Sequence, residues 1–177
     1  MGITIRKATA ADLDAVSGIY SRIHDEIEAG RASIGWLRDI YPTRATAEAA
    51  LARDDLFVEE QDGLVVGTAI LNQTQVDAYF GAPWEHDVPE SQVMVLHTLT
   101  VDPARGGGGY GTAFVAFYED WARSHGCRAL RIDTYARNTA ARGFYRKLGY
   151  REIAIVPVTF NGIPGVDLVL LEKFLDA

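Results

Sequence analysis

Four consecutive glycines, Gly106 to Gly109, constrain the fold of this chain more than any other feature of its sequence. They lie between an apolar segment that ends at Val101 and a helical pattern that begins after Gly111. Each glycine costs about 0.5–1 kcal/mol of backbone entropy relative to alanine, so a run of four requires a reason. Without Cβ atoms, successive N–H groups can converge on an oxyanion at the positive end of a helix. The strand, loop and helix therefore predict a phosphate site, with a merely flexible turn as the simpler alternative.

Two other phosphate-binding patterns overlap this loop. Gly106, Gly108 and Gly111 satisfy the GxGxxG spacing of dinucleotide-binding folds, and the next predicted strand carries Asp133. The loop begins after residue 100, however, which leaves little chain for the second half of a doubly wound sheet. A nucleotide-hydrolysing P-loop is excluded because Thr112 follows Gly111 directly, with no lysine between them.

Hydrophobic spacing divides the rest of the chain into strands and helices. Residues 72–92 have no clean period, and a loop of that length in a compact domain is uncommon unless it is functional or hides structure. Residues 93–101 are apolar at nearly every position, which indicates a central strand covered on both faces. The other predicted elements are strands at 3–7, 56–60, 64–71, 129–135, 150–158 and 166–171, helices at 9–30, 43–53, 112–125 and 138–148, and a short turn or helix at 34–41. They fit a single α/β (α+β) domain over residues 1–177, with one mixed sheet flanked by helices.

Charge and composition restrict the partners. The net charge of −7 argues against nonspecific nucleic-acid binding. Residues 102–151 nevertheless hold nine Lys and Arg against four acids, which indicates either an anionic ligand bound there or an ordinary solvated surface. The single cysteine, Cys127, excludes an intramolecular disulfide and a cysteine metal cluster, and it reads as a buried core residue. With no signal-peptide or membrane-span pattern, a cytoplasmic protein without a metal is expected.

Two segments resemble the GNAT superfamily of acetyl-CoA-dependent N-acetyltransferases. The first runs from Leu99-Thr100-Val101-Asp102-Pro103 through the loop to Gly111, and the second is Asn138-Thr139-Ala140-Ala141-Arg142-Gly143-Phe144-Tyr145-Arg146-Lys147-Leu148-Gly149-Tyr150. The second segment is the more specific, since its Asn, Ala, Phe-Tyr and Gly-Tyr all have the family's spacing. One departure is that the family's usual Gln or Arg falls on Gly106, with Arg105 one place early. This change affects cofactor affinity rather than cofactor identity.

The resemblance implies a GNAT-like, mostly antiparallel sheet of about seven strands and about four helices, splayed in the middle for coenzyme A. It also implies that acetyl-CoA is the cofactor and that its pantetheine arm bonds to the backbone of the strand before the loop. Asn138 is in addition a favoured helix N-cap, and both roles can hold. The cofactor-binding residues implied by the family are Leu99, Thr100, Val101, Gly106, Gly107, Gly108, Gly109, Tyr110, Gly111, Thr112 and Asn138.

The family also implies direct attack of an amine on the thioester in a ternary complex. Tyr145 matches the family's general acid, and core packing is its alternative role. His97 lies where many relatives place a glutamate base, and a satisfied core histidine is equally compatible with its apolar strand. The expected acceptor is a small amine or a peptide amine, and a homodimer is possible. Two other functions are also compatible with the sequence, namely a non-catalytic acyl-CoA sensor and a dinucleotide-binding oxidoreductase. Candidate acceptor-pocket residues are Asp25, Glu26, Glu28, Trp36, Tyr79, Trp84 and Glu85.

Overall fold

A seven-stranded mixed sheet and four α-helices make up the protein, as a computed structural model of residues 2–176 describes it. The helix and strand types and their order agree with the sequence pattern, which confirms the predicted fold class. The strands are β1 (Ile3–Lys7), β2 (Leu56–Gln61), β3 (Leu64–Asn72), β4 (Val93–Val101), β5 (Ala129–Tyr135), β6 (Arg151–Phe160) and β7 (Ile163–Phe174). The helices are α1 (Leu13–Glu28), α2 (Arg44–Ala52), α3 (Tyr110–Ser124) and α4 (Thr139–Lys147).

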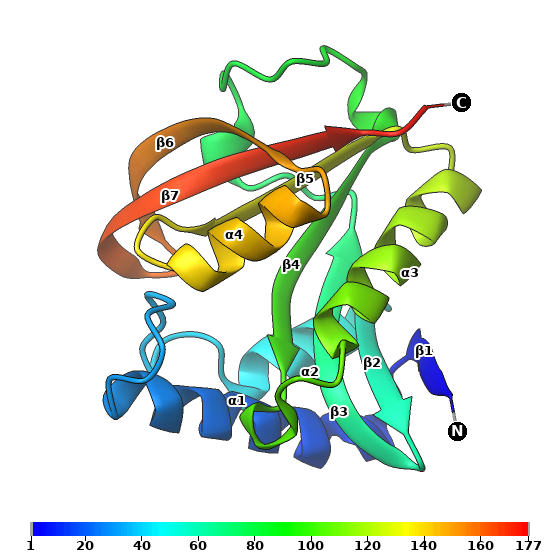
Figure 1. Cartoon of the computed structure of the whole chain (residues 1–177), viewed down its shortest axis with the longest axis vertical. Helices are drawn as coiled ribbons and strands as arrows, with labels where there is room; N and C mark the ends of the chain where they lie inside the picture. The colour runs from blue at the N-terminus through cyan, green and yellow to red at the C-terminus, as the bar shows by residue number, and fades with distance from the viewer. Residues whose placement is uncertain (1, 177) are drawn as a thin grey trace.

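The sheet divides between β4 and β5, as Figure 1 shows. Its strand order is β1-β2-β3-β4-β5-β7-β6, and β4 with β5 is the parallel pair, while the other neighbours are antiparallel. The parallel pairing extends from Val93 with Ala129 to Leu96 with Ile132 and then stops. Beyond that point the two strands separate, which confirms the predicted splay in the middle of the sheet.

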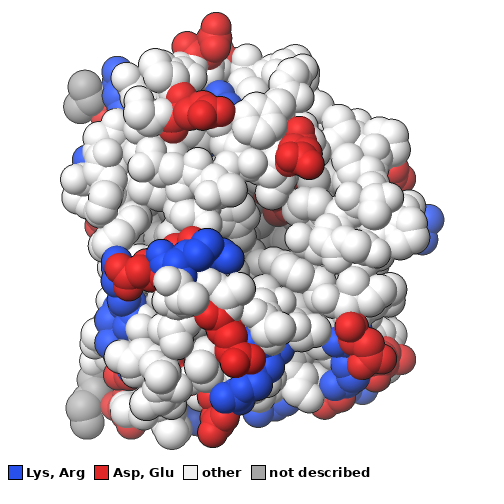
Figure 2. All heavy atoms as spheres, turned by 180° about the vertical axis from the view of Figure 1, so that it is seen from behind, with Lys and Arg blue, Asp and Glu red and all other residues white. Residues whose placement is uncertain are grey.

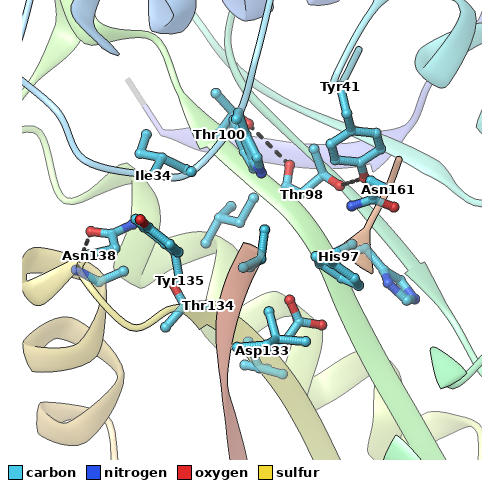
Figure 3. A pocket seen from close by; sticks show the side chains of 18 of the residues that line it. Ile34, Tyr41, His97, Thr98, Thr100, Asp133, Thr134, Tyr135, Asn138 and Asn161 are labelled. Atoms are coloured by element: carbon cyan, nitrogen blue, oxygen red, sulfur yellow. Dashed lines mark hydrogen bonds between the residues drawn. The ribbon is translucent and has the colours of Figure 1, made fainter. Parts of the chain in front are cut away.

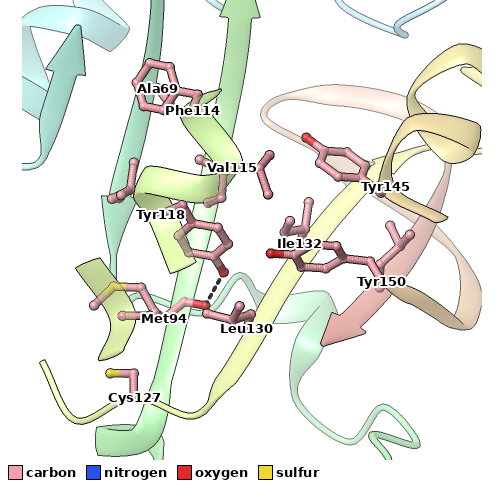
Figure 4. Close-up of a cluster of buried hydrophobic side chains, with 14 of the residues drawn as sticks. Ala69, Met94, Phe114, Val115, Tyr118, Cys127, Leu130, Ile132, Tyr145 and Tyr150 are labelled. Carbon is pink, nitrogen blue, oxygen red and sulfur yellow. Dashed lines mark hydrogen bonds between the residues drawn. The ribbon is translucent and has the colours of Figure 1, made fainter. Parts of the chain in front are cut away.

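The two faces of the sheet are covered differently. Helices α3 and α4 cover one face, where buried side chains such as Phe114, Tyr118 and Ile132 form one core (Figure 4). On the opposite face, α1 and α2 cover the β2–β3 half, with Val16 and Ala47 among the buried side chains. On the β5–β7 half of that face, no α-helix of residues 2–176 covers the strands, and the loop that precedes β4 packs there instead.

That loop, residues 73–92, contains two short 3-10 turns and is fixed to the sheet by a buried ion pair. Arg131 on β5 donates from Nε to Glu172 Oε2 at 3.1 Å, and both side chains are almost fully buried. Its other nitrogens donate to Gln75 Oε1 at 2.8 Å and to the His86 carbonyl at 2.9 Å. The loop is therefore ordered, and the side chains that hold it, Arg131 and Glu172, lie on strands distant from it in sequence.

The last two strands are longer than predicted. We expected strands at 150–158 and 166–171 joined around Asn161 and Gly162, and the structure has this turn, with both strands extended up to it. Pro164 hides the start of β7, whereas the predicted strand at 150–158 already ran through Pro157. Pro157 is tolerated because β6 lies at the edge of the sheet.

Part of the basic surplus in residues 102–151 is structural. Three of its arginines pair with acids outside the segment, namely Arg131 with Glu172, Arg142 with Glu152 and Arg151 with Glu85. The surplus therefore overstates the charge left for a ligand. Within residues 2–176, no helix combines the length and apolarity that crossing a bilayer requires.

Glu59 on β2 is buried without a partner, and this predicts an unusual pH dependence of stability. Its side chain has no exposed surface, and neither carboxylate oxygen has a hydrogen-bond partner in the described part of the chain. Burial raises the pKa of Glu59 to about 8. Between about pH 4.3 and 8 the unfolded chain releases this proton while the folded chain keeps it, so the folded state loses relative stability as the pH rises.

Glu59→Gln is therefore expected to increase the free energy of unfolding at pH 7 by about 3 kcal/mol more than at pH 4.5. Urea unfolding of both proteins across this pH range measures the difference. Glu90→Gln, on an exposed 3-10 turn, is the control and is expected to show no such trend. A stability difference that does not change with pH would mean that Glu59 is ionised in the folded protein.

Candidate active site

A cavity opens where β4 and β5 separate. It has a volume of about 180 Å³ and lies between residues 96–101 of β4 and 132–135 of β5. Tyr145 of α4, the segment 34–41 and the beginning of β7 close its other sides. Figure 3 shows the side chains around it, and Figure 2 shows a hollow in the middle of the face opposite the viewer of Figure 1. Six of the thirteen predicted site residues line this cavity, whereas residues 106–112 lie outside its lining; the six are His97, Leu99, Thr100, Val101, Asn138 and Tyr145.

On the β4 side, a bulge turns the strand away from its parallel neighbour. Thr98 and Leu99 together oppose Ala69 of β3, and Thr98 has a φ of +54°, which is strained for a β-branched residue. The Thr98 hydroxyl is hydrogen-bonded to the Tyr41 hydroxyl across the cavity. As predicted from the resemblance, Leu99, Thr100 and Val101 lie along the cavity, and β5 does not pair with this part of β4.

The glycine loop follows β4 and presents a row of free amides. Gly107 and Gly109 have φ values of +83° and +74°, which favour glycine, and a Cβ on Gly108 would collide with the Tyr110 ring. None of the backbone N–H groups of residues 106–112 donates a hydrogen bond to another described residue, and α3 has no side-chain N-cap. A row of free donors at a helix N-terminus suits a diphosphate.

Three predicted loop and helix positions also have structural roles. A Cβ on Gly111 would lie 3.2 Å from the Phe144 ring, so this glycine lets α3 approach α4 closely. Tyr110 donates its hydroxyl to Gln61 on β2. Asn138 accepts from the Ala141 N–H at 3.1 Å, which confirms its N-cap role, and it lines the cavity as well.

Tyr145 presents its hydroxyl to the cavity. The ring is 7% exposed and packs edge-on against Phe144 and Tyr150 in the core, so its predicted packing role is real. The hydroxyl has no hydrogen-bond partner among residues 2–176, although it lines the cavity. Burial, assisted by the charge of Asp133, raises the Tyr145 pKa above its ordinary value, so the phenol stays protonated at neutral pH.

His97 is turned toward β3 by its hydrogen bond. Its Nε2 lies 2.7 Å from Asn72 Oδ1, and the Asn72 amide donates to Asp55 Oδ2 at 2.9 Å. Because the Asn72 nitrogen is used in this way, its oxygen accepts from His97, and the proton is on Nε2. Burial lowers the His97 pKa to about 4, so the ring is uncharged at neutral pH. The ring is partly exposed and lines the cavity, but its Nε2 is satisfied by Asn72, and its role as general base stays a prediction.

Asp133 is a candidate site residue that sequence reasoning did not identify. It follows Ile132, the last β5 residue paired with β4, and it points to the same face as His97, which follows Leu96. Its Oδ2 accepts from the hydroxyl of Tyr79 at 2.6 Å, and the carboxylate lines the cavity. Burial raises the Asp133 pKa to about 6, which the Tyr79 bond partly offsets. An aspartate inside an apolar strand, where this residue type is depleted, was the available signal.

The predicted acceptor pocket was mostly wrong. Of its seven residues only Trp36 lines the cavity. The three acids of α1 pair with Arg31 and Arg38 on the surface, because the turn after α1 brings those arginines back beside the helix. Tyr79 contributes indirectly through Asp133, while Trp84 packs on Arg131 and Glu85 pairs with Arg151. Sequence proximity on one helix therefore did not indicate proximity to the site.

The parallel strands β4 and β5 separate midway and leave room for an extended ligand between them. The free amides of the glycine loop, which follows β4, suit a diphosphate on that ligand. An extended arm that carries a diphosphate is typical of coenzyme A, so this is the architecture of an acyl-coenzyme A transferase. The sequence matches the acetyltransferase (GNAT) family over residues 22–150, so the chain belongs to that family. Membership confirms the predicted acyltransferase class and acetyl-CoA as the acetyl donor.

Known proteins agree with this assignment. An uncharacterized N-acetyltransferase of Methanocaldococcus jannaschii is 26% identical to this chain over 156 residues. The match covers 86% of this chain and 62% of the archaeal protein, so the chain spans less than two thirds of that relative. A GNAT-family acetyltransferase structure from Streptococcus agalactiae superposes with a TM-score of 0.82 at 20% identity, covering 100% of this chain and 98% of that one. The acetyltransferase yncA of Salmonella typhimurium, solved with acetyl-CoA, has a TM-score of 0.68 at 23% identity and coverages of 99% and 95%.

Proposed function

We propose that this protein transfers the acetyl group of acetyl-CoA to a primary amine, which attacks directly in a ternary complex. The observation that carries the proposal is one cavity that brings the unpaired edge of β4, which leads into the glycine loop, together with the side chains of Asp133 and Tyr145. A non-catalytic sensor would need the amides but would have no use for a carboxylate and a phenol facing the same space. This arrangement favours an enzyme over the sensor, and the split sheet disfavours an oxidoreductase.

At the cofactor end, the backbone N–H groups of residues 106–112 would hold the diphosphate, and Asn138 would bind from the opposite wall. The unpaired edge of β4 at Leu99 to Val101 would bond the pantetheine arm, because its backbone groups have no strand partner on the β5 side. Acetyl-CoA supplies an acetyl group activated as a thioester. A backbone donor near Leu99 can then stabilise the charge that develops on the carbonyl oxygen.

At the acceptor end, two side chains manage the protons. An amine with a pKa near 10 arrives protonated, so a base must take one of its protons. Asp133 accepts it at Oδ1, because Oδ2 already accepts the Tyr79 hydroxyl. Tyr145 holds a proton on its hydroxyl and donates it to the sulfur that leaves, and the second proton lost by the acetylated nitrogen returns the phenolate to a phenol. His97, with the lower pKa and an occupied Nε2, is the second candidate for the base.

Tyr145→Phe is expected to reduce turnover at least about 10-fold while leaving the dissociation constant of acetyl-CoA within about twofold of the wild type. Thiol release with an amine panel measures turnover. A thermal-shift titration measures binding, since stabilisation follows the ligand concentration, and NAD should give none.

Tyr150→Phe is the matched control, because the Tyr150 hydroxyl donates to Glu119 outside the cavity. It is expected to retain wild-type turnover. Equal turnover in Tyr145→Phe and Tyr150→Phe would leave Tyr145 a packing residue. Binding of acetyl-CoA without thiol release for any amine would support the sensor.

A further inference from the structure

We infer that the acceptor is a small primary amine with an uncharged, largely apolar or aromatic body, and that Asp133 selects it by excluding amines that carry a carboxylate. The inference rests on the proposed function and narrows its substrate class. The sequence alone left both a small amine and a peptide amine open as the acceptor.

The first argument is charge. Asp133 is the only Asp, Glu, Lys or Arg among the described residues that line the cavity. An ammonium group can therefore pair with Asp133, but a carboxylate on the same substrate would meet no cation and would lie within a few ångströms of the same acid. In a partly desolvated cavity such repulsion is strong.

The adjoining groove has a cation, but it lies outside this cavity. Arg53 lines the adjoining groove between α2 and β3, and its Nε already donates to Asp55 Oδ2 at 3.1 Å. His97, between the two spaces, is uncharged at neutral pH. Neither group can neutralise an acid bound beside Asp133.

The second argument is the shape and chemistry of the walls. Trp36, Tyr41, Tyr135 and Phe160 line the cavity with aromatic side chains. Such walls suit an apolar or aromatic body, which gains stability when it leaves water.

The third argument is that two segments close the acceptor end. A Cβ on Gly35 would lie 2.9 Å from the Tyr135 ring, so the segment after α1 rests directly on β5. On the other side, a Cβ on Gly162 would lie 3.4 Å from the side chain of Ile40, which brings the β6–β7 turn against the same segment. The Tyr41 hydroxyl bonds to Thr98 beneath them. A cavity closed in this way fits a small molecule better than a peptide chain.

The test uses pairs of acceptors that differ only by a carboxylate. With the wild-type protein and acetyl-CoA, phenethylamine and tyramine are expected to have kcat/KM values about 100-fold higher than L-phenylalanine and L-tyrosine. A tripeptide with a free N-terminus is expected to react no faster than the amino acids. Thiol release gives the rates, and calorimetry in the presence of coenzyme A gives the affinities of the same compounds.

Asp133→Asn removes the charge and keeps the shape. In this variant the affinities of phenethylamine and L-phenylalanine are expected to come within about threefold of each other, because the charge that separates them is gone. Equal or faster reaction of the amino acids or the peptide with the wild-type protein would overturn the inference, and so would an affinity ratio unchanged by Asp133→Asn. If no compound releases thiol, the proposed function fails, while the affinity ratio still tests the selection by Asp133.

Discussion

Gly109→Val is expected to weaken acetyl-CoA binding at least about 100-fold without unfolding the protein. Gly109 caps α3 with a φ of +74°, a conformation in which a β-branched residue is strained. Relief of that strain would rotate the neighbouring peptides, and the free amides of the loop would no longer converge. Each hydrogen bond to a charged group contributes about 1.5–3 kcal/mol, so the loss of two is sufficient for this effect. Calorimetric titration with acetyl-CoA measures it.

Gly126→Val provides the matched control at the other end of the same helix. Gly126 has a φ of +72°, and a Cβ there would meet nothing within 4 Å, as is also true at Gly109. The two variants therefore carry similar strain, but only Gly109 belongs to the loop. If both variants bind acetyl-CoA with equal affinity, the loop amides do not hold the cofactor.

The elements with local signals were predictable from the sequence. The glycine run at 106–109 predicted a strand, a loop and a helix, because few other arrangements justify the backbone entropy cost of four glycines. The stripe that contains Phe144 and Tyr145, closed by Gly149, predicted α4 with nearly its observed bounds. The family resemblance then supplied the splayed sheet, which hydrophobic spacing alone does not indicate, because the splay depends on how two strands distant in sequence lie together.

The features with nonlocal causes were not predictable. The loop before β4 is ordered by Arg131 and Glu172, which are 41 residues apart and read separately as surface charges. The proposed acceptor end depends on the contact between Tyr79 and Asp133, which are 54 residues apart, so neither residue alone indicated it. Tyr79 was expected to contact the amine, and Asp133 only entered through the dinucleotide pattern. Buried polar pairs of this kind are visible only when the fold brings both partners together.

Asp133→Asn is expected to reduce turnover of an amine about 1,000-fold and to leave the dissociation constant of acetyl-CoA unchanged. A positioned general base contributes about 100- to 10,000-fold, and the same charge also holds the ammonium group. The asparagine keeps the shape and can still accept from Tyr79, so the cavity should persist. Circular dichroism and acetyl-CoA titration check the fold and the cofactor site. Wild-type turnover in this variant would remove Asp133 from the reaction.

The pH profile distinguishes Asp133 from His97 as the base. A base works only when deprotonated, and the Asp133 pKa is about 6, so kcat/KM of the wild type should fall about tenfold per unit as the pH drops below 6. This acid limb should vanish in Asp133→Asn, since asparagine does not titrate. If His97 were the base, the limb would lie near its pKa of about 4 and would survive in Asp133→Asn. His97→Gln should then abolish the limb, whereas with Asp133 as the base His97→Gln leaves it near pH 6.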